Sequence, residues 1–305
     1  MAIRLFTHPD CDLHNPDPEH PECPARIAAI TDQLIRSGLD YVLRQQVAEP
    51  ASLEAVYRAH SRVYVDELIA KTPSEGHIWL DPDTPMTAAS MRAALAAAGA
   101  GIAAVNGVMQ SEDRQAFCAV RPPGHHATYD QAMGFCLLNN VAIAATHALH
   151  QFDLQRIAII DFDVHHGNGT EDIFQHDERV LFCSSFQSQL YPFSDEHSHR
   201  KGIIKTALPA GSKSLAWREA VYHSWLPALN EFKPELILVS AGFDGHSEEE
   251  LAQFFLVEDD YFWISEKLKR IADTHASGRI VSILEGGYSL SALGRSVVAH
   301  LKGLL

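Results

Sequence analysis

Hydrophobic residues along the chain follow two alternating patterns: short unbroken runs, and longer segments in which they recur every three or four positions. Five short runs have the length of buried β-strands, at residues 116–120, 157–161, 180–186, 236–241 and 279–284. Helical spacing fills most of the intervals between them, near 139–151, 215–232, 259–276 and 289–302. This alternation predicts an α/β fold in which helices cover both faces of a mainly parallel sheet.

The first part of the chain is less regular. Residues 2–6 favour a first strand, and residues 72–86 favour a long loop because prolines and a glycine interrupt them. Three segments show helical spacing, at 25–36, 53–71 and 87–109. The apolar stretch 93–109 contains alanines, glycines and Asn106, which indicates a buried helix and not a membrane span. No repeat or linker divides the chain, so one domain is expected over residues 1–305.

Composition and charge narrow the choice of partners. Of the 305 residues, 46% are hydrophobic and 21% are charged, which excludes disordered, collagen-like and coiled-coil proteins. The net charge of −15 argues against a nucleic acid partner, because phosphate binding needs a basic face, and it suits a cationic substrate. Five scattered cysteines and no visible N-terminal signal favour a cytoplasmic protein with reduced thiols and no membrane partner.

Unusual polar motifs follow four of the predicted strands. They are Arg-Pro-Pro-Gly-His-His-Ala at 121–127, Asp-Phe-Asp-Val-His-His-Gly-Asn-Gly at 161–169, Ala-Gly-Phe-Asp-Gly-His at 241–246 and Glu-Gly-Gly-Tyr at 285–288. Ligands of open α/β sheets bind outside the carboxyl ends of the strands. We therefore expect the four motifs to meet at one edge of the sheet and to form a site there.

Three residues of these motifs form a candidate metal site. Alternate side chains of an extended segment share a face, so Asp163 and His165 can bind one ion together, and Asp244 is the natural third ligand. Two carboxylates and one imidazole suit Zn²⁺, Fe²⁺ or Co²⁺ and leave a coordination position for water, as a catalytic site requires. The alternative is that Asp161 and Asp163 only cap a following helix.

Other residues of the motifs suit acid–base chemistry. His125 and His126 follow a rigid Pro-Pro-Gly turn, and Asp161 and Asn168 are available to set the tautomers of their rings. Tyr288 follows two glycines and can donate a hydrogen bond to a carbonyl oxygen. The alternatives are two loop histidines with satisfied hydrogen bonds and a buried structural tyrosine.

These four motifs, in this order, resemble the metal-dependent histone deacetylase superfamily, from about His8 to Tyr288. The resemblance implies an open, arginase-like α/β sheet and hydrolysis of the acetyl amide of N-acetyl-lysine in proteins or peptides. It implies Asp163, His165 and Asp244 as ligands of Zn²⁺, with Fe²⁺ as an alternative metal. The Glu-Gly-Gly-Tyr and His-His-Gly-Asn-Gly sequences are most similar to the class II and bacterial branch.

The same resemblance assigns roles in catalysis. His126 is implied to be the general base and later the general acid, with His125 as its electrostatic partner. Asp161 is implied to hold His125, and the hydroxyl of Tyr288 to polarise the substrate carbonyl.

The resemblance also assigns substrate contacts and a second ion. Gly134 and Phe135 are implied to form one wall of an acyl-lysine tunnel and Tyr191 the opposite wall, with Asp83 at the rim and Arg26 deep in the site near the route of the acetate. A monovalent cation site, for K⁺, is implied at Asp161, Asp163, His165, Ser184 and Ser185.

Some positions depart from the family pattern and leave the substrate open. Asn168 stands where some members have Asp, and Tyr191 stands where Phe is more usual. Leu251 occupies the position of the glutamate that animal polyamine-selective members carry, which weakens an acetylpolyamine substrate without removing it. Acetylpolyamines, small acetylated metabolites and longer acyl-lysines therefore stay as alternatives, and a homo-oligomer is possible.

Two other functions, a second zinc site and a solvated acidic run were also considered from the sequence. A two-metal ureohydrolase would need an aspartate where Gly167 stands, and an inactive acyl-lysine binder would normally lack one of the catalytic residues. The spacing of Cys11, His14, His20 and Cys23 suits a second zinc ion, although a substrate-rim loop is the favoured interpretation. The acidic run 248–250 is expected to be a solvated face.

Overall fold

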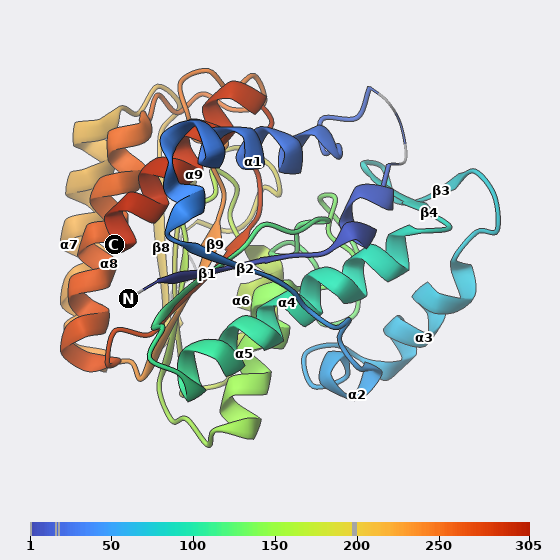
Figure 1. The fold of residues 1–305 in the computed structure, drawn as a ribbon, viewed down its shortest axis with the longest axis horizontal. Helices are drawn as coiled ribbons and strands as arrows, with labels where there is room; N and C mark the ends of the chain where they lie inside the picture. The colour runs from blue at the N-terminus through green and yellow to red at the C-terminus, as the bar shows by residue number, and fades with distance from the viewer. Residues whose placement is uncertain (1, 16, 18, 197–199) are drawn as a thin grey trace.

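The computed structural model describes residues 2–305 except 16, 18 and 197–199. Within these residues the main strands are β1 (Ile3–Thr7), β2 (Leu43–Val47), β5 (Gln115–Cys118), β6 (Ile157–Asp161), β7 (Val180–Gln187), β8 (Ile203–Leu208), β9 (Leu236–Ala241) and β10 (Ile280–Leu284). They form one sheet in the order β2-β1-β5-β10-β9-β6-β7-β8, and every neighbouring pair is parallel. In Figure 1 the labelled strands β1, β2, β8 and β9 of this sheet lie at the centre of the molecule, with helices around them. The predicted parallel sheet is confirmed.

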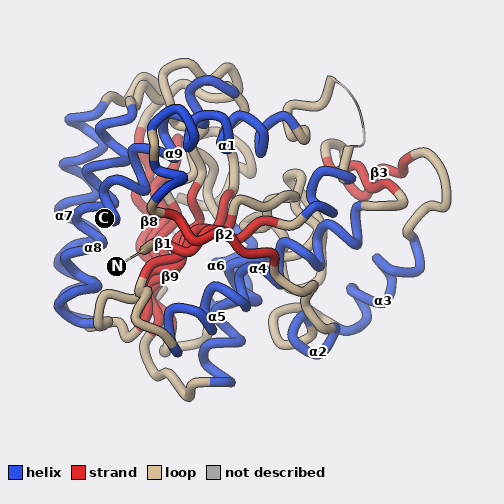
Figure 2. Tube along the Cα trace, in the orientation of Figure 1, coloured by secondary structure: helices blue, strands red, loops and turns tan. Residues whose placement is uncertain are grey.

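Helices cover both faces of this sheet (Figure 2). One face carries α1 (Ala25–Ser37), α7 (Ser214–Phe232), α8 (Glu258–His275) and α9 (Leu290–Leu304); the other carries α4 (Ser90–Gln110), α5 (Asn140–Gln151) and α6 (Asn168–Phe174). Successive residues of β6 alternate between the two cores, with Ile159 in one and Ile160 in the other. Because both faces are buried, the central strands are uninterrupted hydrophobic runs, which made them visible in the sequence.

Several elements differ from the sequence-based expectation. The segment 53–71 forms two helices, α2 (Leu53–Val56) and α3 (Arg62–Lys71), and not one. The predicted loop at 72–86 is wrong, because it contains an antiparallel hairpin of β3 (His77–Asp81) and β4 (Thr84–Thr87). Each strand of a two-stranded hairpin has one free edge, so the position of Pro85 in β4 can face away from the hydrogen-bonded ladder.

The two edge strands of the main sheet were not predicted. Strands β2 and β8 have the sequences Leu-Arg-Gln-Gln-Val and Ile-Ile-Lys-Thr-Ala-Leu, which are more polar than the central strands. Their outward-facing positions are partly or fully exposed, as expected at the edges of a sheet.

Helix α4 is apolar and long enough to cross a membrane by composition alone. In the structure most of it is buried, since it packs between α5 and strands β1, β5 and β10. The prediction of a buried helix is confirmed.

A buried ionic network ties the N-terminal loop to the sheet. The carboxylate of Glu22 accepts hydrogen bonds from Arg121 Nη2 (2.6 Å) and Arg26 Nη1 (3.2 Å), and all three side chains are fully buried. Arg121 also donates to the carbonyl oxygens of Cys11 (2.8 Å) and His14 (2.9 Å). Burial alone would raise the pKa of Glu22, but the charges of Arg121, His14 and Arg26 lower it to about 2.

We expect Glu22→Gln to destabilise the protein by roughly 3–5 kcal/mol, because it leaves two buried guanidinium groups without a counter-charge. Urea unfolding measures this change. The control is Glu67→Gln, which removes an exposed ion pair with Lys71 and should change the free energy of unfolding by less than about 0.5 kcal/mol. A change as small as the control's would contradict a stabilising role of Glu22.

The pH dependence of this difference has a defined sign. The pKa of Glu22 is about 2 in the folded state and 4.5 in the unfolded state. Ionised Glu22 therefore stabilises the folded state fully above pH 4.5, and this stabilisation disappears as the pH falls toward about 2. The difference between wild type and Glu22→Gln should therefore be constant above pH 4.5 and shrink below it.

Candidate active site

A cavity of about 210 Å³ lies at the carboxyl ends of the four central strands β5, β10, β9 and β6. Its lining residues are Asp83, Pro123, His125, His126, Gly134, Phe135, His165, Leu190, Tyr191, Leu251, Gly286 and Tyr288. The four strands are direct neighbours in the sheet, so the motifs that follow them meet at this place. The structure thus brings together the residues that the sequence singled out.

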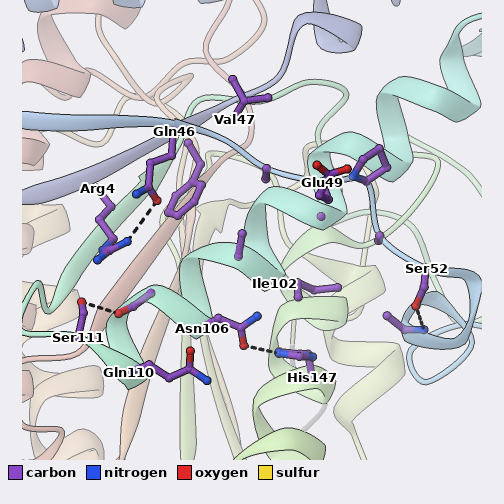
Figure 3. Close-up of a pocket in the computed structure, with 18 of the residues that line it drawn as sticks. Arg4, Gln46, Val47, Glu49, Ser52, Ile102, Asn106, Gln110, Ser111 and His147 are labelled. Atoms are coloured by element: carbon purple, nitrogen blue, oxygen red, sulfur yellow. Dashed lines mark hydrogen bonds between the residues drawn. The ribbon is translucent and has the colours of Figure 1, made fainter.

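A larger cavity of about 940 Å³ lies elsewhere, along α4 beside β2, α2 and α5 (Figure 3). Four of its polar side chains bind one another in pairs: Arg4 donates to Gln46 (3.2 Å), and Asn106 contacts His147 (2.8 Å). None of the residues predicted from the strand-end motifs lines it. The smaller cavity is therefore the candidate active site.

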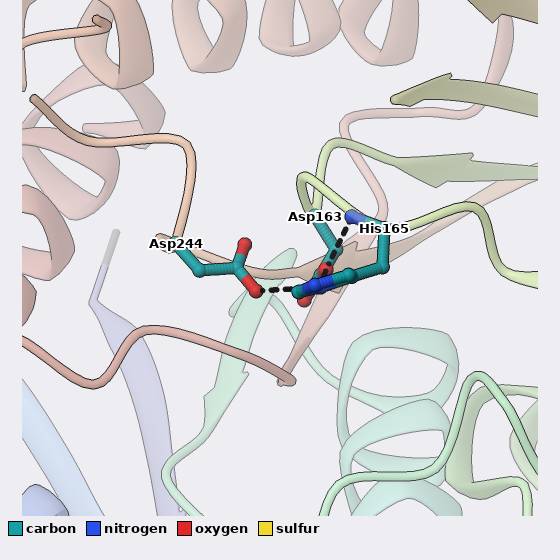
Figure 4. A group of neighbouring side chains, drawn as sticks. All are labelled: Asp163, His165 and Asp244. Carbon is teal, nitrogen blue, oxygen red and sulfur yellow. Dashed lines mark hydrogen bonds and ion pairs between the residues drawn. The ribbon is translucent and has the colours of Figure 1, made fainter. Parts of the chain in front are cut away.

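Asp163, His165 and Asp244 converge beside the smaller cavity (Figure 4). The Nδ1 atom of His165 lies 3.0 Å from Asp163 Oδ1 and 3.1 Å from Asp244 Oδ2, and the candidate ligand atoms all lie within 4.8 Å of one another. Asp163 and His165 follow β6, and Asp244 follows the adjacent β9. This donor set fits one divalent cation of the Zn²⁺ or Fe²⁺ type.

The electrostatics of these three residues also fit a cation. Burial and the neighbouring charge of Asp163 raise the pKa of Asp244 to about 7. Burial lowers the pKa of His165, but its hydrogen bonds to both carboxylates raise it to about 10. Both shifts express an excess of buried negative charge, which a divalent cation would compensate.

The backbone passes very close to these ligands at Gly286. Its amide donates a hydrogen bond to Asp163 Oδ2 (2.9 Å). A Cβ atom at this position would lie 2.2 Å from Asp244 Oδ2 and 2.6 Å from Asp163 Oδ2, which is sterically impossible. The second residue of Glu-Gly-Gly-Tyr must therefore be a glycine if both carboxylates are to keep their positions.

The two adjacent histidines have the partners that the sequence suggested. His125 Nδ1 lies 2.9 Å from Asp161 Oδ2, and His126 Nδ1 lies 2.7 Å from Asn168 Oδ1. Because the amide oxygen of Asn168 only accepts, Nδ1 of His126 carries the hydrogen and Nε2 is left free to accept a proton. The two rings lie 4.0 Å apart between centroids.

The pKa values of these histidines shift in opposite directions. Burial opposes the protonated form of His125, but the charges of Asp161 and Asp163 raise its pKa well above the ordinary value. Burial and the neighbouring His125 and His165 lower the pKa of His126 well below the ordinary value. His126 is therefore the neutral imidazole of the pair and the better candidate for a general base.

Tyr288 borders the same cavity, and its ring packs edge-on against Phe135 with centroids 5.8 Å apart. Burial raises the pKa of Tyr288 well above the ordinary value, so the hydroxyl stays protonated and can donate. Arg26 does not line the cavity. Its guanidinium lies 4.9 Å from the centroid of the Tyr288 ring and donates to the carbonyl oxygens of Gly287 (2.7 Å) and Glu285.

The predicted tunnel walls belong to the cavity lining. Tyr191 packs edge-on against His126, with ring centroids 5.1 Å apart. Gly134 and Phe135 have positive φ angles of 57° and 67°, and their amides donate to Asp83 Oδ1 and Thr84 Oγ1, both at 3.1 Å. The unpredicted β3–β4 hairpin therefore holds this wall in place. Burial and the neighbouring Asp81 raise the pKa of Asp83 to about 6.

Two glutamates make contacts that the sequence did not predict. Glu285 is fully buried, and its Oε2 accepts hydrogen bonds from the amides of Gly124 (2.6 Å) and His125 (3.1 Å). Glu249 was expected on a solvated face, but its Oε2 accepts hydrogen bonds from the amides of Tyr288 (2.7 Å) and Ser289 (3.1 Å). No sequence signal marked either contact, because the partners are backbone groups.

The residues expected to bind a monovalent cation lie on the adjacent strands β6 and β7 and in the segment that follows β6. Asp161 and Ser184 are register partners on β6 and β7, and Ser184 Oγ lies 3.0 Å from His166 Nδ1. The Ser185 hydroxyl accepts a hydrogen bond from Trp217 Nε1 (3.0 Å).

The proposed second zinc set has other contacts. Nδ1 of His14 lies 2.7 Å from Ser90 Oγ, and His20 packs edge-on against Phe135. Within the described part of the chain, Asp163, His165 and Asp244 are the group whose ligand atoms converge.

Comparison with known proteins adds family evidence. Residues 20–304 match the sequence model of the histone deacetylase domain. The chain is 37% identical over 314 residues to histone deacetylase 14, chloroplastic, of Arabidopsis thaliana, covering 96% of this chain and 74% of that protein. It is 34% identical over 297 residues to the histone deacetylase-like amidohydrolase of Pseudomonas aeruginosa, covering 94% and 77%.

The fold agrees with this evidence. The HDA15 HD domain superposes with a TM-score of 0.91 at 29% sequence identity, over 100% of this chain and 90% of that domain. The family model spans nearly the whole chain, and the relatives exceed 30% identity over most of their length. The chain therefore belongs to the histone deacetylase family of hydrolases.

Proposed function

We propose that the protein is a zinc-dependent deacetylase that hydrolyses the acetyl amide of N-acetyl-lysine in proteins or peptides. The convergence of Asp163, His165 and Asp244 beside the cavity that His126 and Tyr288 line carries this proposal. Hydrolysis of an amide requires an activated water, an acid for the leaving amine and a donor for the carbonyl oxygen, and the cavity contains residues suited to each role.

Asp163, His165 and Asp244 would hold the divalent cation, with Fe²⁺ as the alternative to Zn²⁺. Such an ion lowers the pKa of water from about 16 to about 7 and polarises a carbonyl oxygen. The proposal includes K⁺ as a second ion, held by Asp161, Asp163, His165, Ser184 and Ser185. The register pairing of Asp161 with Ser184 across β6 and β7 supports this second site.

The side chains above this site move the protons. Nε2 of His126 takes the proton of the attacking water and later donates it to the leaving amine nitrogen. The hydroxyl of Tyr288 donates a hydrogen bond to the carbonyl oxygen as negative charge develops on it. His125, whose pKa is raised beside Asp161 and whose ring lies 4.0 Å from that of His126, acts as the electrostatic partner of the base.

The cavity suits a straight alkyl chain that ends in an amide. Phe135, Leu190, Tyr191 and Leu251 supply apolar surface, and Asp83 supplies a carboxylate. The carboxylates of Asp81 and Asp83 and the net charge of −15 also favour a cationic acetylpolyamine, which is the second candidate substrate. The five cysteines are free, which supports the proposal of a reducing compartment such as the cytoplasm.

The direct test is turnover of acetyl-lysine peptides, longer acyl-lysine peptides and acetylpolyamines by protein of measured metal content. We expect the acetyl-lysine peptide to be the best substrate and Asp244→Ala to lose both the metal and the activity. Asp273→Ala, which changes a half-exposed carboxylate on α8, should keep both. Full metal occupancy in Asp244→Ala would show that the ligand set is wrong, and faster turnover of acetylpolyamines would favour the second substrate.

Tyr288→Phe tests the carbonyl donor. Removal of one such donor typically costs about 10²–10³-fold in kcat, so we expect a loss of this size with unchanged metal content. Tyr222→Phe, on the exposed surface of α7, is the matched control and should be fully active. Wild-type kcat in Tyr288→Phe would rule out the assigned role.

Asn168→Asp tests the general base through pH. A carboxylate beside Nδ1 favours the protonated ring, so the pKa of His126 should rise. The reaction needs neutral His126, so the acidic limb of the kcat/KM profile should move to higher pH. Asn106→Asp, which makes the same change beside His147 in the larger cavity, should leave the profile unchanged. An unshifted profile in Asn168→Asp would argue against His126 as the base.

A further inference from the structure

We propose that Glu249 is a positioning residue for Tyr288, so that a carboxylate outside the cavity fixes the orientation of the phenol inside it. The inference rests on the proposed role of Tyr288 as carbonyl donor. It concerns a residue that does not line the cavity and that the sequence placed on a solvated surface.

The contact itself is specific. A single oxygen, Oε2 of Glu249, accepts hydrogen bonds from the consecutive amides of Tyr288 (2.7 Å) and Ser289 (3.1 Å). Hydrogen bonds to an ionised carboxylate are shorter and stronger than those between neutral groups. Ser289 is the N-cap of α9, and its side chain makes no capping bond, so the carboxylate also supplies the negative charge favoured at the start of that helix.

Arg26 holds the same segment through its carbonyl groups. It donates to the carbonyl oxygens of Glu285 and Gly287 and packs over the ring of Tyr288. The positive group thus binds the carbonyls and the negative group binds the amides of one short segment. Together the two side chains determine the direction of the backbone on both sides of the Tyr288 Cα atom.

The segment needs this support because of its glycines. Gly287 immediately precedes Tyr288 and has a φ angle of +119°, a conformation that side-chain-bearing residues rarely adopt. Gly286 is bound on its other side, by the amide hydrogen bond to Asp163 and by the bond from Phe243 N to its carbonyl oxygen (2.9 Å). Beyond Gly287, the backbone amides of Tyr288 and Ser289 depend on Glu249.

The chain that contains Glu249 also builds other parts of the site. It runs on from Asp244 after β9, and Leu251, two residues beyond Glu249, lines the cavity. The amide of Glu249 donates to the carbonyl of His246 (2.9 Å), which fixes the turn. One segment therefore supplies a proposed metal ligand, a wall of the cavity and the anchor of Tyr288.

The neighbouring Glu250 provides the matched control, and Glu248 does not, because it has an ion pair of its own. Glu248 binds Arg295 on α9 (2.6 Å), and Glu250 is exposed. Glu250→Ala changes the same charge one residue away from the anchor, so it measures the effect of lost surface charge alone.

A double-mutant cycle between Glu249 and Tyr288 tests the proposal. Kinetics on an acetyl-lysine peptide are measured for Glu249→Ala, Glu249→Gln, Tyr288→Phe, Glu249→Ala with Tyr288→Phe, and Glu250→Ala, all at equal metal content. Misplacement of a reacting group by about 1 Å can cost up to about 10²-fold in rate. We expect Glu249→Ala to lower kcat by roughly 10- to 100-fold with KM within about twofold.

Two further results are expected. Glu249→Gln keeps an oxygen acceptor and should lose less kcat than Glu249→Ala, while Glu250→Ala should match wild type. In the Tyr288→Phe background the phenol hydroxyl is already gone, so Glu249→Ala should lower kcat by no more than about twofold further.

The alternatives give different outcomes. An equal loss from Glu249→Ala in both backgrounds, or no loss in either, would overturn the positioning role and leave the proposed function intact. Loss of bound metal in Glu249→Ala would also overturn it, because the effect would then pass through Asp244. Wild-type activity of Tyr288→Phe would overturn the assigned role of Tyr288 and this inference with it.

Discussion

The site depends on a concentration of buried negative charge at the carboxyl edge of the sheet. Asp161, Asp163, Asp244 and Glu285 are all fully buried at the ends of three adjacent strands. Burying a charge is costly unless it is paired, and the pKa values of Asp244 and Glu285, both raised to about 7, reflect that cost. The opposite charges available nearby are the two histidines, His125 and His165, and the cation that the three ligands would hold. The need to compensate the buried carboxylate charge therefore favours a bound cation and also an ordered arrangement of the residues around it.

Backbone amides donate further hydrogen bonds to these buried carboxylates. Asp163 accepts from Gly286 N, Asp244 from Val164 N (2.9 Å) and Glu285 from Gly124 N. Each of these bonds joins one strand-end loop to another, so the carboxylates act as links between segments that are distant in sequence. This arrangement explains why the loops need glycine where they pass the carboxylates, since a side chain at Gly286 would displace Asp163 and Asp244, the two aspartates of the candidate metal site.

The contrast between what the sequence predicted and what it missed follows from the same physics. The central strands were visible because burial on both faces demands continuous hydrophobic runs. The motifs were visible because they concentrate histidine, aspartate and tyrosine side chains at strand ends. Strands β2 and β8 were missed because edge strands tolerate polar residues. Glu249 and Glu285 were missed for a different reason. Their partners are backbone amides, which leave no trace in the sequence of the segment that donates them.

Arg26 belongs both to the buried ionic network and to the support of the candidate active site. Its guanidinium binds Glu22 in the buried network and also binds the carbonyls of the Glu-Gly-Gly-Tyr segment. A guanidinium has five donors spread over three nitrogens in a rigid plane, so it can bind a carboxylate and two carbonyls at once. The three donors of a lysine ammonium all belong to one nitrogen atom. The orientation of the Arg26 plane is set by Glu22, which Arg121 holds in turn. The position of Tyr288 consequently depends on the N-terminal loop as well as on the strand that precedes it.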